Sequence, residues 1–228
     1  MTVLLVLFTL VVFLTADHFV QRARARRVAE TVRDKVTSAA DSLKQIPAGV
    51  ELAINHTWMK KDHGSVITVG FDEFIARFFG KVERIVLPAI GDRVENMFLM
   101  DGERSLPLLA PVSGKVVAVN RQVLMDPSLA YADPYDQGWL LKVEVPSRQA
   151  VVAPIVSAAS DWLKQQIVTA REFFLGHPGA VNYALMQDGG TVVDGVLKMY
   201  DNAVWAEFGR TFLAVPAASK PAGEPANR

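Results

Sequence analysis

The chain has 228 residues, of which 50% are hydrophobic, and its 24 Lys and Arg balance its 24 Asp and Glu. A chain with no basic surplus gives no reason to expect a nucleic acid as its partner. Because it has no cysteine, a disulfide framework, a thiolate metal site and a thiol nucleophile are all excluded. The length fits one compact domain with attachments, or two small domains.

The N-terminal segment, residues 1–20, predicts a single transmembrane helix. Residues 1–16 carry no charge, and the apolar character continues to Val20 if Asp17 and His18 lie near the lipid headgroups. Sixteen to twenty helical residues span roughly 24–30 Å, which is the short end of a membrane-spanning helix. Asp17 and His18 are then either hydrated at headgroup depth or in contact with a partner subunit inside the membrane.

A cluster of arginines directly after this segment predicts its orientation. We expect these side chains at the membrane interface: Arg22, Arg24, Arg26 and Arg27. Because basic residues favour the cytoplasmic side, the N-terminus should lie outside and the rest of the chain in the cytoplasm. The alternative is a signal peptide cleaved after Ala16, but it would lack the positive segment that normally precedes the apolar stretch.

Residues 21–47 predict an amphipathic helix next to the membrane. Apolar residues recur at helical spacing, and Pro47 ends the pattern; these residues are Val28, Val32, Val36, Ala39, Leu43 and Ile46. Such a helix can pack on the following domain, lie on anionic lipid or pair with another helix.

Residues 48–148 predict a β-rich domain of short strands separated by turn residues. The predicted strands are 50–54, 65–69, 81–87, 97–100, 106–109, 114–120 and 139–145, with a short helix at 71–79. Many short strands with Gly, Asp and Pro between them favour a small barrel or sandwich. Trp58, Tyr135 and Trp139 are expected to close its ends, because their large apolar area favours burial.

Helical periodicity returns in residues 149–215. An apolar stripe predicts one helix from Val151 to Phe174, and a second helical region runs from about Val192 to Leu213 with a break near Asp201. Residues 216–228 contain three prolines and no aromatic residue, so we expect a disordered tail.

Several sequence blocks of the β-rich part resemble the H protein of the glycine cleavage system, a lipoyl carrier with a barrel-sandwich hybrid fold. The blocks occur in the family's order and nearly at its spacing. They are His56-Thr57-Trp58, Gly91-Asp92-Arg93-Val94, Pro111-Val112-Ser113-Gly114 and Asp133-Pro134-Tyr135-Asp136-Gln137-Gly138-Trp139. The resemblance implies an α+β chain with an H-protein-like barrel-sandwich hybrid and flanking helices.

The chain departs from the family at the hairpin between Val94 and Pro111. The resemblance places there a tip of the form Glu-Ser-Val-Lys-Ala, whose lysine carries lipoate through an amide. Here the segment contains no lysine, and counting back from Pro111 puts Glu103 or Arg104 at that position. Neither side chain is an amine that can be acylated, so we expect no lipoyl group. We also expect no other cofactor and no metal.

Two surfaces are candidates for docking a partner protein. One is the polar hairpin tip formed by Asp101, Gly102, Glu103 and Arg104, although a turn can be polar merely because water surrounds it. The other is the apolar face of the helix inserted after the last strand, with Trp162, Phe173 and Phe174. That face can instead pack on the barrel, on the helix of residues 21–47 or on another subunit.

No catalytic motif stands out in the sequence. It has no nucleotide-binding glycine loop and no Gly-x-Ser-x-Gly elbow. His56, His63 and Asp62 surround Trp58 and could be assembled into an acid–base site, but structural or solvent roles are favoured for both histidines. We therefore expect no enzyme activity and no small-molecule substrate.

The sequence thus favours a non-catalytic, membrane-anchored accessory or scaffold subunit of a complex that faces the cytoplasm. Its expected partners are the membrane and other protein subunits. One alternative is a lipoyl-type carrier, in one-carbon or sulfur metabolism, that uses a different lysine. Another is an adaptor of the membrane-fusion type, although that class places its domain outside the cytoplasm.

Overall fold

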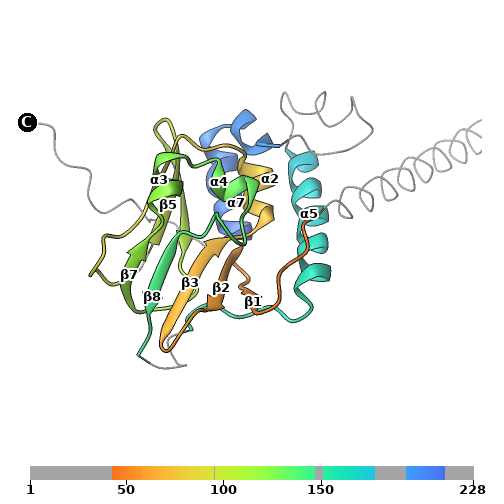
Figure 1. The fold of residues 1–228 in the computed structure, drawn as a ribbon. Helices are drawn as coiled ribbons and strands as arrows, with labels where there is room; N and C mark the ends of the chain where they lie inside the picture. The colour runs from red at the N-terminus through yellow and green to blue at the C-terminus, as the bar shows by residue number, and fades with distance from the viewer. Residues whose placement is uncertain (1–42, 95, 147–150, 178–193, 214–228) are drawn as a thin grey trace, which may run out of the picture.

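The computed structural model describes residues 43–94, 96–146, 151–177 and 194–213. Within these ranges the chain forms a mixed α+β fold of two small sheets and a layer of helices (Figure 1). Among the described residues no helix is both long enough and apolar enough to cross a membrane. The predicted anchor, residues 1–20, and most of the predicted helix of residues 21–47 lie outside these ranges.

The larger sheet has the strand order β1-β2-β3-β8-β7, and all of its neighbouring strands are antiparallel. Its strands are β1 (Val50–Leu52), β2 (Thr57–Lys61), β3 (Val66–Phe71), β7 (Lys115–Val119) and β8 (Leu141–Glu144). The smaller antiparallel sheet has the order β4-β5-β6. Its strands are β4 (Arg84–Val86), β5 (Asn96–Asp101) and β6 (Arg104–Leu109).

Three helices lie on the β1 side of the large sheet, as Figure 1 shows: α2 (Glu73–Phe79), α5 (Ala159–Gly176) and α7 (Asn202–Phe212). Two short helices, α3 (Arg121–Met125) and α4 (Leu129–Ala132), connect β7 to β8, and a 3-10 turn η2 (Val196–Met199) precedes α7. Asp72 caps α2 by accepting from the Phe74 N–H, and Asp201 caps α7 in the same way.

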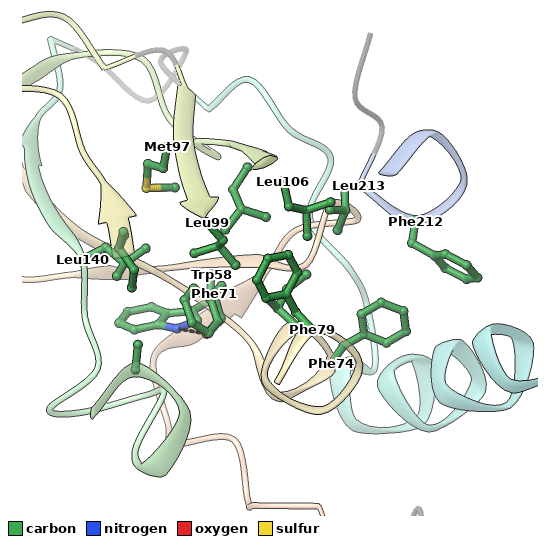
Figure 2. Close-up of a cluster of buried hydrophobic side chains, with 14 of the residues drawn as sticks. Trp58, Phe71, Phe74, Phe79, Met97, Leu99, Leu106, Leu140, Phe212 and Leu213 are labelled. Carbon is green, nitrogen blue, oxygen red and sulfur yellow. Dashed lines mark hydrogen bonds between the residues drawn. The ribbon is translucent and has the colours of Figure 1, made fainter. Parts of the chain in front are cut away.

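One hydrophobic core joins the two sheets to the helices. Side chains from β5, β6, α2 and the C-terminal segment belong to the buried cluster of Figure 2, in which Leu99, Leu106 and Phe79 are labelled. Trp58 and Tyr135 are buried as expected, and Trp139 is half-buried. Helices α5 and α7, which lie in the predicted helical part of residues 149–215, contribute side chains to this same core.

Two helix boundaries and three short elements differ most from the sequence prediction. Residues 43–47 are not helical, so the predicted helix of residues 21–47 does not extend to Pro47. The helix predicted from Val151 begins at Ala159, because residues 151–156 run extended and make backbone hydrogen bonds to Pro111, Leu52 and Ile54. Strand β2 and helices α3 and α4 were not predicted.

Candidate functional site

The end of the β5–β6 hairpin is a two-residue turn. Asp101 and Arg104 are the last paired residues, and Gly102 and Glu103 form the turn between them. Gly102 has φ 60°, a conformation that glycine adopts at no steric cost and that tight hairpin turns require at this position. The local sequence therefore fixes where the hairpin reverses.

Asp101 lies between two cations at this hairpin end. Its Oδ2 is 3.0 Å from the Arg104 guanidinium, and its Oδ1 is 2.8 Å from Nζ of Lys198, which comes from η2. The Lys198 ammonium also donates to the main-chain carbonyl of Lys81. These contacts bring together three segments that are far apart in the sequence.

Arg104 fastens the hairpin end to the C-terminal segment. Its Nη1 donates to the carbonyl oxygens of Lys198 at 3.3 Å and Tyr200 at 3.2 Å. The guanidinium carbon lies 4.6 Å from the centre of the Trp205 ring, a cation–π geometry. Trp205 in turn donates from Nε1 to the Ser105 carbonyl at 3.1 Å. We call this set of Asp101, Arg104, Lys198 and Trp205 the hairpin lock.

Only the turn residues of the tip are exposed. Gly102 and Glu103 are accessible to solvent, whereas Asp101 and Arg104 are half-buried. The Gly102 N–H donates to Oε2 of Glu83 at 3.1 Å, which ties the turn to the segment before β4. The sequence from residue 82 to residue 114 contains no lysine. The exposed tip therefore offers a carboxylate and backbone groups, but no amine.

The other predicted docking residues pack against the chain itself. Phe174 is fully buried against Phe78, Tyr200 and Phe208. Phe173 is half-buried, and its ring lies 5.6 Å from that of Phe212. The apolar face of α5 thus packs against α2, which lies in the predicted β-rich domain, and against α7, a contact that was not among the alternatives considered from the sequence.

Trp162 packs on the ring of a buried histidine, His56. Nδ1 of His56 lies 2.9 Å from the Asp72 carboxylate, and neither side chain is accessible to solvent. The His56 ring is stacked between Phe74 at 3.7 Å and Trp162 at 4.7 Å. His63, by contrast, is 80% exposed on the turn between β2 and β3 and pairs with Asp62. The two histidines are therefore in different environments and do not form one acid–base site.

Sequence reasoning identified one side of the hairpin lock and missed the other. Asp101 and Arg104 were candidates, but Lys198, Tyr200 and Trp205 were not. Arg104 lies 94 residues before Lys198, and no sequence pattern connects them. The predicted membrane-interface residues lie outside the described residues: Asp17, His18, Arg22, Arg24, Arg26 and Arg27.

A family profile described as Glycine cleavage H-protein matches residues 50–164, which is half of the chain. The chain belongs to this family. The match covers both sheets and ends inside α5, so most of α5 and all of η2 and α7 lie outside it. The C-terminal half of the hairpin lock is therefore contributed by a part of the chain that the family profile does not include.

Curated relatives named glycine cleavage system H protein agree with this assignment. The relative from Carboxydothermus hydrogenoformans is 34% identical over 116 residues, covering 88% of its own length and 49% of this chain. The one from Bifidobacterium longum is 38% identical, covering 75% of its length and 44% of this chain. A crystal structure of an H protein from Mycobacterium marinum aligns with a TM-score of 0.45 at 25% identity, covering 98% of that chain and 53% of this one.

Proposed function

We propose that this member of the glycine cleavage H-protein family is a non-catalytic protein without a lipoyl group. In this proposal it serves as an accessory or scaffold subunit of a membrane complex. The observation that carries the proposal is the hairpin lock together with the lack of lysine in the hairpin. Where the family resemblance implies an acylated lysine, this chain has an exposed Glu103 and an Arg104 turned toward its own C-terminal segment.

The chemistry of acylation supports this reading. Lipoate attachment forms an amide with a neutral primary amine, and glutamate supplies none. An arginine guanidinium is a planar hydrogen-bond donor that stays charged in proteins, so it is a poor acyl acceptor. In this chain the guanidinium is also held by three oxygen acceptors and by the Trp205 ring.

The attachment to a membrane rests on the sequence. Residues 1–20 have the length and composition of a short anchor, and the arginines that follow favour a cytoplasmic soluble domain. The beginning of the described chain is fixed to the domain: the Lys44 N–H donates to Glu73 at 2.7 Å, and Leu43 and Ile46 pack against the core. A pull on the anchor would therefore act directly on the folded domain.

Intact-mass measurement tests the missing lipoyl group. The full chain is produced in cells that attach lipoate, with a glycine cleavage system H protein expressed alongside as the positive control. We expect the control to gain the lipoyl mass and this chain to keep its unmodified mass. A lipoyl adduct on any lysine of this chain would overturn the proposal.

Purification in mild detergent tests the scaffold role. We expect the chain in the membrane fraction together with at least one co-purifying protein, in a fixed ratio that survives a second purification step. Recovery from membranes as a stable monomer with no co-purifying protein would contradict a scaffold role, and recovery from the soluble fraction would contradict the anchor.

A carrier that uses a different lysine is the second candidate, and one observation indicates where to look. Nζ of Lys198 lies at the hairpin end, 2.8 Å from Asp101. Both the Asp101 carboxylate and the Lys81 carbonyl accept from it, so its Nζ is already engaged in hydrogen bonds within the chain. An adduct that maps to Lys198 and disappears in Lys198→Arg would establish this candidate.

A further inference from the structure

His177 joins the end of α5 to α7. Its Nδ1 lies 2.8 Å from the carbonyl oxygen of Phe173, one turn earlier on α5, and its Nε2 lies 3.3 Å from Oε2 of Glu207 on α7. The imidazole ring also lies 4.4 Å from the ring of Phe173. The histidine therefore contacts both helices at the point where α5 ends.

Both of these partners are hydrogen-bond acceptors. A neutral imidazole has one N–H, so in that state one ring nitrogen would present its lone pair to a carbonyl or a carboxylate oxygen. Only the protonated imidazolium donates to both partners at once. A positive charge at the C-terminal end of α5 is also favoured by the helix dipole.

The ring of Phe173 connects this contact to the aromatic core between the helices. It lies 6.0 Å from the ring of Phe208 and 5.6 Å from that of Phe212, both on α7. We call the contact among Phe173, Phe208 and Phe212 the aromatic seam. His177 contacts this seam through the ring of Phe173, so the seam is the part of the α5–α7 contact that the His177 bonds adjoin.

We propose that protonated His177 is a pH-sensitive latch that closes the aromatic seam between α5 and α7 and opens it as the imidazole loses its proton. The proposal is independent of lipoylation and of membrane attachment. It gives the chain a way to expose apolar aromatic surface in response to rising pH. Phe173, which the sequence marks as a docking residue, lies in this seam.

The surrounding charges favour the closed state at low pH. The bond to the Phe173 carbonyl, with smaller contributions from Glu207 and Asp201, raises the pKa of His177 above its ordinary value of 6.5. Arg171 and Glu172 on α5 and Arg210 on α7 are further charged residues close to it in the sequence of the two helices. Because the folded pKa is raised, the stabilisation is complete below the unfolded value and is lost as the pH rises through the folded value.

Hydrogen exchange of the full chain in mild detergent, read by mass spectrometry, tests the latch. We compare exchange rates after correcting for the intrinsic pH dependence of exchange. Peptides from 159–177 and 202–213 should exchange roughly 2- to 5-fold faster at about pH 8 than at about pH 6. In His177→Gln this dependence should vanish, because glutamine does not titrate. Glu207→Gln should reduce it and should lower the pKa of His177 measured by NMR.

His63→Gln is the control, because His63 is likewise a histidine beside a carboxylate but is exposed and lies on the β2–β3 turn. It should leave the pH dependence of the seam unchanged. The proposal fails if His177→Gln keeps the wild-type pH dependence, or if seam exchange in the wild type does not change across the interval. It also fails if NMR places the pKa of His177 at or below its ordinary value.

Discussion

The sheets and the helical layer of this protein are stabilised by different kinds of side chain. The sheets bury mainly aliphatic residues, such as Leu99 on β5, Leu106 on β6 and Val143 on β8, whereas the contact among α2, α5 and α7 is built largely from phenylalanine. The sheets lie within the part matched by the family, while most of α5 and all of α7 lie outside it.

The two regions are nevertheless in close contact. Helix α2 belongs to the matched part, and its Phe74 and Phe78 pack against Phe208 of α7. The helices outside the matched range thus bury an aromatic face of α2 and, through the hairpin lock, contact the hairpin end as well. If the two regions depend on each other in this way, substitutions at their contacts should lower the free energy of unfolding more than matched substitutions elsewhere.

The largest expected effect comes from removing an aromatic ring from the helical layer. Phe174 is fully buried, so Phe174→Ala should lower the free energy of unfolding by about 3–5 kcal/mol, measured by urea denaturation. Leu175→Ala, at the next residue, is the control. The Leu175 side chain is 45% exposed, so this substitution should change the free energy of unfolding by less than about 0.5 kcal/mol. Separate transitions for helices and sheets in the wild type would mean that the two regions fold independently.

The close contact between α2 and the C-terminal segment should give the next largest effect. A Cβ on Gly80 would lie 2.6 Å from Cα of Gly195, and Gly80 has φ 69°. Gly80→Ala should therefore cost about 2–4 kcal/mol from backbone strain and overpacking together.

Gly64→Ala separates the two contributions to this loss. Gly64 has φ 57° but no atom within 4 Å of its added Cβ, so the substitution should cost only the strain, about 1–2 kcal/mol. Equal losses for the two variants would show that the Gly80–Gly195 contact does not constrain the two regions.

The hairpin lock should have an intermediate effect. Arg104→Ala removes three hydrogen bonds and the contact with Trp205, so it should lower the free energy of unfolding by about 1.5–3 kcal/mol. Arg84→Ala, at an exposed arginine on β4, is the control and should be nearly neutral. Hydrogen exchange should rise in η2 and α7 of the Arg104 variant; an increase confined to the β5–β6 turn would contradict the lock.

The smallest effect is expected at a surface pair within the large sheet. Lys142 donates to Asp62 at 2.6 Å and, together with His63, lowers the pKa of the Asp62 carboxyl. The small stabilisation is therefore present above the ordinary pKa of the carboxyl and is lost as the pH falls through its lowered value. Asp62→Asn should remove only this acidic part of the pH dependence of stability, without changing α5 or α7. Altered hydrogen exchange of α5 or α7 in this variant would contradict the prediction, because it would show that the Asp62–Lys142 pair also affects the helices.

Much of the sheet architecture was predictable because its signals are local. The turn at Asp101-Gly102 and the breaks at Gly91 and Gly114 separate runs of strand-forming residues. Strand β2 was missed because its burial does not alternate: Thr57, Trp58 and Met59 are all buried, and Nε1 of Trp58 donates to the carbonyl of Pro134. Residues 151–156 fit a helical or an extended pattern, and their bonds to Pro111, Leu52 and Ile54 select the extended one.

For the candidate site, the sequence by itself determined that the hairpin end has no lysine and that it turns at Gly102. Only the tertiary structure decided what Arg104 does there. Its acceptors at Lys198 and Tyr200 and the ring of Trp205 reach it from about a hundred residues away. Periodicity and turn preferences act over a few residues, whereas the direction of a long charged side chain depends on which distant segment supplies carbonyl oxygens and an aromatic face within its reach.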